Sequence, residues 1–206
     1  LVACGYAVLV PNVRGSTGYG NAYSHLDDVD KRLDSVNDLA HAAHWLRAQA
    51  DFDGRRVAVL GSSYGGYMVL AALAFHPELW AAGVDIVGIA NFVTYLENTS
   101  GYRRQHRESE YGRLDTDREL LERVSPINAV ERMTAPLLVI HGANDPRVPL
   151  SEAQQLVARL AALGRAAELL VFDDEGHGIT LLKNKRVAYS AIARFLNETL
   201  GASPED

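Results

Sequence analysis

The sequence is poor in cysteine, in positive charge and in long apolar runs. Its single cysteine, Cys4, excludes an internal disulfide framework and a metal site built from several thiolates. The 20 Lys and Arg residues are outnumbered by 26 Asp and Glu, so a net charge of -6 offers nucleic acid no basic surface. No apolar run approaches the roughly 18 residues that a membrane helix needs. We therefore expect a soluble protein without nucleic-acid or membrane partners, and the lone thiol favours a reducing, cytoplasmic location.

Short apolar runs alternate with helical patterns along most of the chain. The runs lie at residues 6–10, 57–60, 82–87, 137–141 and 168–172, and each reads as a strand buried on both faces. Helical spacing of apolar residues covers 35–50, 65–76, 151–163 and 185–200. Strands that alternate with helices form a mainly parallel sheet with right-handed crossovers. The sequence therefore predicts one α/β domain over residues 1–206.

One region interrupts this alternation. Residues 89–133 are rich in Arg, Glu, Asn and Tyr, and show only a short helical pattern at 118–124. Two interpretations are open: a solvated surface excursion, or a segment that lines a pocket, because open parallel sheets bind ligands where their strands end. The last residues, 201–206, are expected to fray.

A glycine-rich turn follows the apolar run at 57–60. The turn reads Gly61-Ser62-Ser63-Tyr64-Gly65 and leads into a helical pattern, which is the strand-turn-helix context of a G-x-S-x-G nucleophile elbow. We expect a strained backbone at Ser63, and we expect a side chain at Gly61 or Gly65 to collide with its neighbours. The motif predicts Ser63 as a nucleophile. An ordinary glycine turn is the alternative.

A serine nucleophile needs a base and an acid, and in enzymes with this motif both follow it, the acid before the histidine. Of the seven histidines, only His177 lies beyond the run at 137–141 and its loop, and glycines flank it. Asp145 follows that same run and is the preferred acid, ahead of Asp173 and Asp174. A turn aspartate and an exposed loop histidine are the structural alternatives. All three chosen residues follow strands, so we expect them at one edge of the sheet.

Four blocks of the sequence resemble, in order, those of the prolyl oligopeptidase family of serine peptidases. They are Asn-Val-Arg-Gly-Ser-Thr-Gly-Tyr-Gly at 12–20, Gly-Ser-Ser-Tyr-Gly-Gly-Tyr at 61–67, His-Gly-Ala-Asn-Asp at 141–145 and Glu-Gly-His-Gly at 175–178. The first block distinguishes this family from generic esterases and does not follow the G-x-G-x-x-G order of a dinucleotide loop. The resemblance spans nearly the whole chain. It implies an α/β-hydrolase fold that needs no cofactor or metal.

The resemblance also implies roles for individual residues. Ser63 would attack a peptide carbonyl, His177 would relay the proton, and water would hydrolyse the acyl-enzyme. The backbone N–H of Tyr64 would form part of the oxyanion hole. The pocket for the residue before the scissile bond would be lined by Val87, Phe92, Tyr95 and Val148. Arg147 resembles an arginine that binds a substrate carbonyl in some members, although a surface ion pair is equally compatible with its position.

The sequence departs from the family at its start. It begins at Leu1 and runs directly into the apolar residues 6–10, without the preceding strand, the oxyanion loop or the upstream β-propeller of family members. We therefore expect the N-terminal strands to be missing, with a gap in the sheet unless an upstream segment or propeller of the same protein fills it. The leading hypothesis is a serine peptidase that acts on short peptides, of the dipeptidyl or acylaminoacyl type. A carboxylesterase acting on small esters and a catalytically silent fragment are the alternatives, and homo-oligomer formation stays open.

Overall fold

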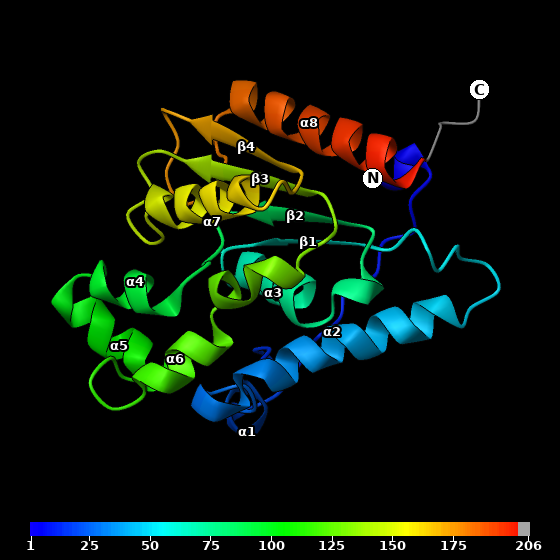
Figure 1. Cartoon of the computed structure of the whole chain (residues 1–206). Helices are drawn as coiled ribbons and strands as arrows, with labels where there is room; N and C mark the ends of the chain where they lie inside the picture. The colour runs from blue at the N-terminus through cyan, green and yellow to red at the C-terminus, as the bar shows by residue number, and fades with distance from the viewer. Residues whose placement is uncertain (202–206) are drawn as a thin grey trace.

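A four-stranded parallel sheet forms the centre of the chain, for which a computed structural model describes residues 1–201 (Figure 1). The strands are β1 (Ala58–Ser62), β2 (Ala82–Ile86), β3 (Leu137–Gly142) and β4 (Ala167–Phe172), and they lie in chain order. Every residue of β3 is buried, because strands flank it on both sides and helices cover both faces. The predicted α/β class is confirmed, and four of the five predicted strands are present.

The four long helices are also those that the sequence predicts. They are α2 (Arg32–Arg47), α3 (Tyr64–Phe75), α7 (Leu150–Ala162) and α8 (Leu182–Leu200). All four begin one to three residues earlier than expected, and α8 ends at Leu200, where Gly201 forms a left-handed C-cap. The tail predicted to fray is 201–206, of which Gly201 donates to the carbonyl of Asn197 and residues 202–206 lie outside the described part. Within residues 1–201, no helix is long and apolar enough to cross a membrane.

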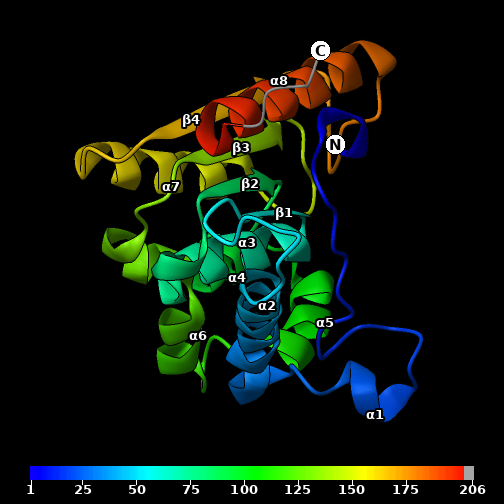
Figure 2. The ribbon, with the colours of Figure 1, turned by 90° about the vertical axis from the view of Figure 1, so that its right-hand side faces the viewer.

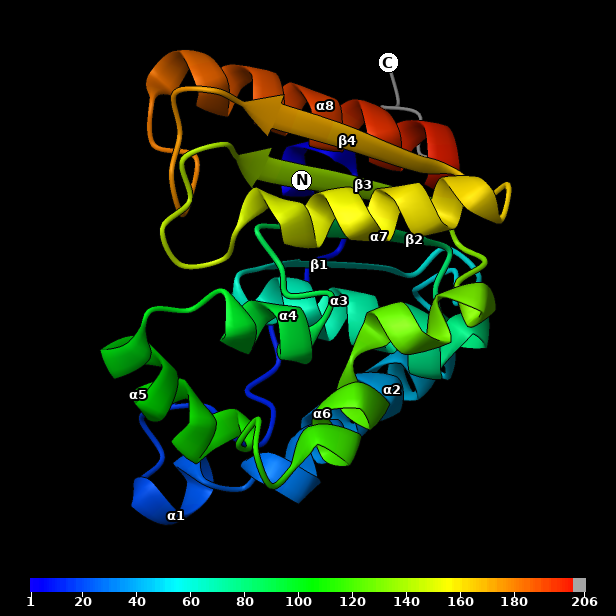
Figure 3. The same cartoon turned by 60° about the vertical axis from the view of Figure 1, so that its left-hand side comes forward.

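Helices cover the two faces of the sheet unequally (Figure 3). On one face, α8 packs against alternate residues of β2 and β3, including Val84 and Ile140. On the other face, α3 and α7 pack against residues such as Val59 and Val139, and α2 packs on the outside of α3. The nucleophile turn therefore connects the edge strand β1 to a largely buried helix, α3.

The predicted strand at residues 6–10 is absent from the sheet. The segment runs down one side of the molecule, from the end of α8 toward α1 (Asn21–Ser24), without joining β1 (Figure 2). The Tyr6 hydroxyl donates to Asn197 of α8 at 2.6 Å, while Val10 is 81% exposed. The prediction is wrong because apolar, β-branched residues form a strand only beside a backbone that can pair with them, and β1 has a paired strand on its β2 side alone among the described residues.

The region at residues 89–133 is more regular than the sequence suggests. It forms α4 (Phe92–Glu97), α5 (Gly101–Tyr111), α6 (Arg118–Val124) and the 3-10 segment η4 (Pro126–Arg132). Phe92, Leu96 and Leu121 are fully buried in one cluster with Tyr67 of α3. The solvated-excursion interpretation is therefore wrong for α4 and α6, whereas α5 is largely exposed, with only Tyr111 buried. Four further short elements complete the described chain: η1 (Val2–Cys4), α1, η2 (Val29–Lys31) and η3 (Pro77–Leu79).

Candidate active site

The turn between β1 and α3 has the strained backbone that the sequence predicts at Ser63. Its φ of 59° and ψ of −118° place a non-glycine residue in a sparsely populated region. The Ser63 N–H donates to the carbonyl of Ile86 at 2.8 Å, and the Ser63 carbonyl accepts from Tyr67 at 3.1 Å. The strain is therefore maintained by β2 on one side and by the first turn of α3 on the other.

The glycines of this turn are not equivalent. A Cβ on Gly61 would lie 2.2 Å from the carbonyl oxygen of Gly65, which confirms the predicted crowding at Gly61. The same prediction is wrong for Gly65, where a Cβ would meet nothing within 4 Å. The crowded position is Gly66, whose Cβ would lie 2.3 Å from Oδ1 of Asp85 and 2.6 Å from Cα of Gly88. Close approach of α3 to the end of β2 thus depends on Gly66.

Ser63, His177 and Asp145 are brought together by three loops at the carboxyl edge of the sheet. Nε2 of His177 lies 2.8 Å from Oγ of Ser63, and Nδ1 lies 2.7 Å from Oδ2 of Asp145. When Nδ1–H donates to the carboxylate, Nε2 is left as the acceptor for the serine hydroxyl. The His177 side chain is 13% exposed, so the chain of hydrogen bonds is shielded but reachable. This is the geometry in which an imidazole can act as a general base.

Asp145 is held as an acceptor by its own loop. Its Oδ1 accepts hydrogen bonds from the backbone N–H groups of Arg147 at 2.8 Å and Val148 at 3.0 Å. Burial alone would raise the pKa of Asp145, but the hydrogen bonds from His177 and these backbone groups outweigh it and lower the pKa. The carboxylate therefore stays ionised at neutral pH beside the imidazole.

The other acidic candidates lie elsewhere. Asp174 forms an ion pair with Lys183 at 2.5 Å and accepts from Asn184 at 2.7 Å, while the Asp173 side chain is exposed. Within residues 1–201, the hydrogen bond that His177 makes to a carboxylate goes to Asp145. Of the three acids considered from the sequence, Asp145 is therefore the one that orients the histidine.

Two residues that the sequence did not single out support this arrangement. Glu175 is 2% exposed and accepts from Thr180, Leu181 and Asn184, which fixes the His177 loop on the start of α8. Burial would raise the pKa of Glu175, but these hydrogen bonds lower it to about 2. The sequence signal that could have identified Glu175 is its place in the Glu-Gly-His-Gly block.

His141 is the second supporting residue and lies behind Asp145. Its Nε2 lies 2.9 Å from the carbonyl oxygen of Val148 and 3.7 Å from Oδ2 of Asp145. Burial lowers the pKa of His141, so the ring is neutral at physiological pH and its Nε2–H donates to the carbonyl. The ring therefore fixes the loop that supplies backbone donors to Asp145.

The residues expected to line a substrate pocket are all buried. Exposure is 0% for Val87 and Phe92, 3% for Tyr95 and 2% for Val148. Phe92, Tyr95 and Val148 belong to one apolar cluster, from which Val87, with a φ of 50°, is separate. Arg147 is exposed and reaches Asp145 through its backbone. Their role in binding substrate stays a prediction.

A buried carboxyl group with one unpartnered oxygen lies beneath the nucleophile turn. Asp85 of β2 is 1% exposed, its Oδ1 has no hydrogen-bond partner within the described chain, and burial raises its pKa to about 7. The folded protein therefore keeps a proton that the unfolded chain loses near the ordinary Asp pKa of 3.8. The contribution of this proton to the free energy of unfolding is fully present at low pH. It is lost as the pH rises from the unfolded to the folded pKa, by ~1.4 kcal/mol for each pH unit in that range.

We expect Asp85→Asn to remove this dependence, because an amide does not titrate. The difference in melting temperature, variant minus wild type, should increase between pH 5 and pH 7 and then remain constant. Thermal denaturation followed by circular dichroism at several pH values measures it, and taking the difference cancels the other titrating groups. A difference that stays constant from pH 5 to pH 8 would show that Asp85 is ionised throughout.

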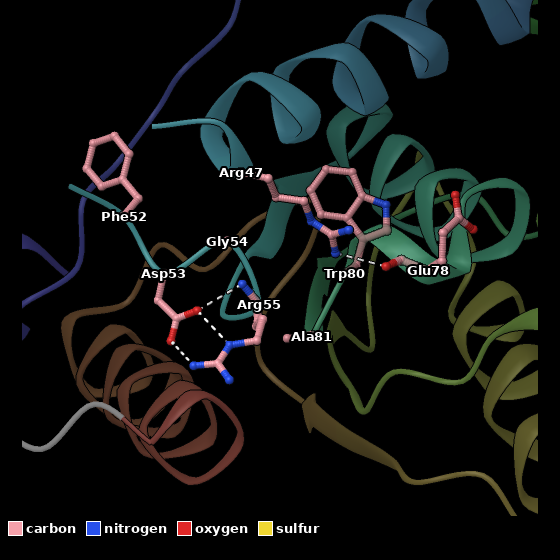
Figure 4. A pocket seen from close by; sticks show the side chains of 8 residues that line it. All are labelled: Arg47, Phe52, Asp53, Gly54, Arg55, Glu78, Trp80 and Ala81. Atoms are coloured by element: carbon pink, nitrogen blue, oxygen red, sulfur yellow. Dashed lines mark hydrogen bonds and ion pairs between the residues drawn. The ribbon is translucent and has the colours of Figure 1, made fainter. Parts of the chain in front are cut away.

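An open hollow lies at the opposite end of the sheet, around the start of β1 and β2 (Figure 4). Asp53 accepts from Arg55 there, and Arg47 donates to the carbonyl of Glu78 at 2.8 Å. These charged groups are already paired with one another or with the backbone. The hollow is thus separate from Ser63 and offers no evident ligand chemistry. In residues 1–201, no cluster of three or more His, Cys, Asp or Glu side chains could hold a metal ion.

Comparisons with known proteins agree on one family. Dipeptidyl aminopeptidase BIII of Pseudoxanthomonas mexicana is 35% identical over 98% of this chain and 30% of its own length. The acylamino-acid-releasing enzyme of Rattus norvegicus is 25% identical over 98% of this chain and 28% of its own length. A puromycin-hydrolyzing peptidase of Mycobacterium tuberculosis superimposes with a TM-score of 0.87 and 29% identity, over 92% of this chain and 29% of that one.

The chain therefore spans about a third of the length of the relatives that it matches. Its own sequence is nonetheless matched almost from end to end, since the profile of the Prolyl oligopeptidase family covers residues 1–203. The parallel sheet flanked by helices is the α/β-hydrolase architecture of these peptidases. On this evidence, the chain belongs to the prolyl oligopeptidase family.

Proposed function

We propose that the chain is the catalytic part of a serine peptidase that hydrolyses short peptides, of the dipeptidyl or acylaminoacyl type. The observation that carries the proposal is the continuous hydrogen-bonded series from Ser63 through His177 to Asp145, at 2.8 and 2.7 Å. The family relationship supports peptides as the substrate class. In this proposal Ser63 is the nucleophile, His177 the general base and acid, and Asp145 the group that orients the imidazole.

The proposed reaction uses this geometry at each step. Oγ of Ser63 attacks the scissile carbonyl carbon while its proton passes to Nε2 of His177. The amine leaves with that proton when the tetrahedral intermediate collapses to an acyl-enzyme. Water, deprotonated by the same nitrogen, then attacks the ester and releases the acid and the free serine. Asp145 stabilises the imidazolium that exists during each transfer, and it keeps its own negative charge.

The developing oxyanion would lie beside the start of α3. Tyr64 is the first residue of that helix, so its backbone N–H has no acceptor within the helix and is available to an oxyanion. The partial positive charge of the helix N-terminus favours the same anion. The described chain would thus supply one oxyanion donor.

We propose that an upstream segment of the same protein completes both the sheet and the oxyanion hole. Two observations support it: β1 is an edge strand with Leu60 46% exposed, and the apolar residues 6–10 lie unpaired nearby. A further strand between them would satisfy both backbones. Because the chain spans about a third of the relatives' length, the full protein could include such a segment and an upstream β-propeller that admits only short peptides. The single cysteine supports a reducing, cytoplasmic location.

Labelling with a fluorophosphonate probe tests the nucleophile assignment. We expect one adduct per chain, located at Ser63 by peptide mass spectrometry, in a protein that includes the upstream segment. Faster hydrolysis of peptide amides than of the matching small esters, relative to their uncatalysed rates, supports a peptidase, whereas turnover of esters alone supports a carboxylesterase. Absence of an adduct in the extended protein would contradict the proposal and favour a catalytically silent fragment.

A further inference from the structure

The side chain of Tyr64, the residue after the candidate nucleophile, ends in a buried charged cluster. Its hydroxyl donates to Oδ2 of Asp27 at 2.6 Å and accepts from Nη1 of Arg32 at 2.7 Å. Ser35 of α2 lies 3.1 Å from the same hydroxyl. Burial raises the pKa of Tyr64, so the phenol keeps its proton and can donate to the carboxylate. The hydroxyl is thus fixed by three groups from outside its own helix.

Arg32 is the centre of this cluster and is only 1% exposed. Besides Tyr64, its Nη1 donates to Asp27 at 2.6 Å, and its Nη2 donates to the carbonyl of Glu110 at 2.7 Å. The guanidinium carbon lies 5.1 Å from the ring centroid of Tyr64 and 4.8 Å from that of Tyr111. Arg32 therefore joins the nucleophile turn to the end of α5.

Asp27 joins the cluster to the N-terminal part of the chain. A Cβ on Gly15, which has a φ of 89°, would lie 2.1 Å from Oδ1 of Asp27, so the carboxylate rests directly on that glycine. Gly15 is held there by a hydrogen bond from its N–H to the carbonyl of Tyr23 at 3.1 Å. The family block at residues 12–20 and the turn around Ser63 thus meet through one carboxylate.

Burial of an ion pair is a poor way to gain stability, because desolvation offsets much of the attraction. A rigid pair of fixed geometry is, however, suited to holding another group in one orientation. We propose that Arg32 and Asp27 are positioning residues that hold the ring of Tyr64, and through it the peptide N–H that follows Ser63, in the orientation that an oxyanion requires. This inference rests on the proposed peptidase function.

The strained backbone explains why such support is needed. With a φ of 59°, Ser63 would relax if the first residue of α3 could rotate, and the peptide plane between Ser63 and Tyr64 would turn with it. Oxyanion donors act only when they point at the place where charge develops. Fixing the far end of the Tyr64 side chain restricts that rotation.

The decisive variant is Tyr64→Phe, which removes the hydroxyl and leaves the ring and the Asp27–Arg32 pair in place. In the full protein that carries this chain, we expect kcat and kcat/KM to fall together by roughly 10- to 100-fold, because the lost alignment matters in the transition state and not in substrate binding. Asp27→Asn should lower kcat as well. Because both changes release the same ring, their effects in the double variant should be less than additive.

Asp38→Asn is the matched control. Asp38 accepts from Arg14 at 2.7 Å and so anchors the same N-terminal segment to α2, but its carboxylate is bonded to Arg14 and not to Tyr64. We expect it to lower the melting temperature without changing kcat. If the cluster has a purely structural role, Tyr64→Phe and Asp27→Asn should likewise lower the melting temperature without changing kcat.

Fluorophosphonate labelling of each variant separates the possible outcomes. Slower labelling of Tyr64→Phe with normal labelling of Asp38→Asn supports the positioning role. Wild-type kcat in Tyr64→Phe overturns it, and if the wild type still labels at Ser63, the peptidase function stands. If the wild type neither labels nor hydrolyses peptides, both the function and this inference are wrong.

Discussion

Ser63→Ala should lower kcat for peptide hydrolysis by about 10⁶-fold, with the melting temperature nearly unchanged. In the proposed mechanism the Ser63 hydroxyl forms the acyl-enzyme, and the variant has no hydroxyl proton to pass to His177. The fold should survive, because the strained turn is held by backbone bonds to Ile86 and Tyr67 and by close packing at Gly61. Steady-state kinetics in the protein that includes the upstream segment, together with thermal denaturation, measures both effects.

Ser62→Ala is the matched control for this prediction. Ser62 is the adjacent residue, ends β1 and is exposed, and its change removes the same number of atoms. It should leave kcat within about twofold, as expected for a surface change away from the hydrogen-bonded series. Equal losses in the two variants, or full activity in Ser63→Ala, would assign the chemistry to another group.

Asp145→Asn should lower kcat by roughly 10⁴-fold. The amide can donate to Nδ1 of His177, which favours the tautomer with its proton on Nε2, and that nitrogen then cannot accept the proton of Ser63. The imidazolium formed during catalysis also loses its ionised partner. Asparagine retains an oxygen that can accept the N–H groups of Arg147 and Val148, so the loop should keep its shape.

Asp173→Asn provides the comparison for this second prediction. Asp173 lies near His177 in the sequence but has an exposed side chain, so we expect kcat to change by less than about twofold. Measuring kcat and circular dichroism for Asp145→Asn and Asp173→Asn distinguishes a change at the imidazole from a change in the folded population. Retention of a tenth or more of the wild-type kcat by Asp145→Asn would show that His177 is oriented by another group.

The parts of the molecule that could be predicted are those whose signals are local. Residues 137–140 form an unbroken apolar run because β3 is buried on both faces, and β2 is also buried, although Asp85 interrupts its apolar run. Ser63, Asp145 and His177 each follow such a run, so their convergence at one edge follows from the parallel sheet alone. The glycines around Ser63 predict a tight turn from the sequence alone.

The parts that could not be predicted depend on distant neighbours. The segment at 6–10 has strand-forming residues but no partner strand in the described chain, while α5 has almost no apolar residue to reveal its period. Nothing near Arg32 and Asp27 in the sequence indicates that both contact the hydroxyl of Tyr64. The crowding at Gly66 depends on Asp85, which belongs to another strand.

The order of the strands also determines when the candidate site can form during folding. Ser63 and His177 are 114 positions apart, and the pairing β1-β2-β3-β4 must be complete before their loops meet. Parallel pairings of this kind have high contact order and form slowly. A partly folded chain consequently has the nucleophile without its base. Any peptidase activity would then appear in a single late folding step. By that time the chain's own segments are folded and no longer accessible to the site as substrates.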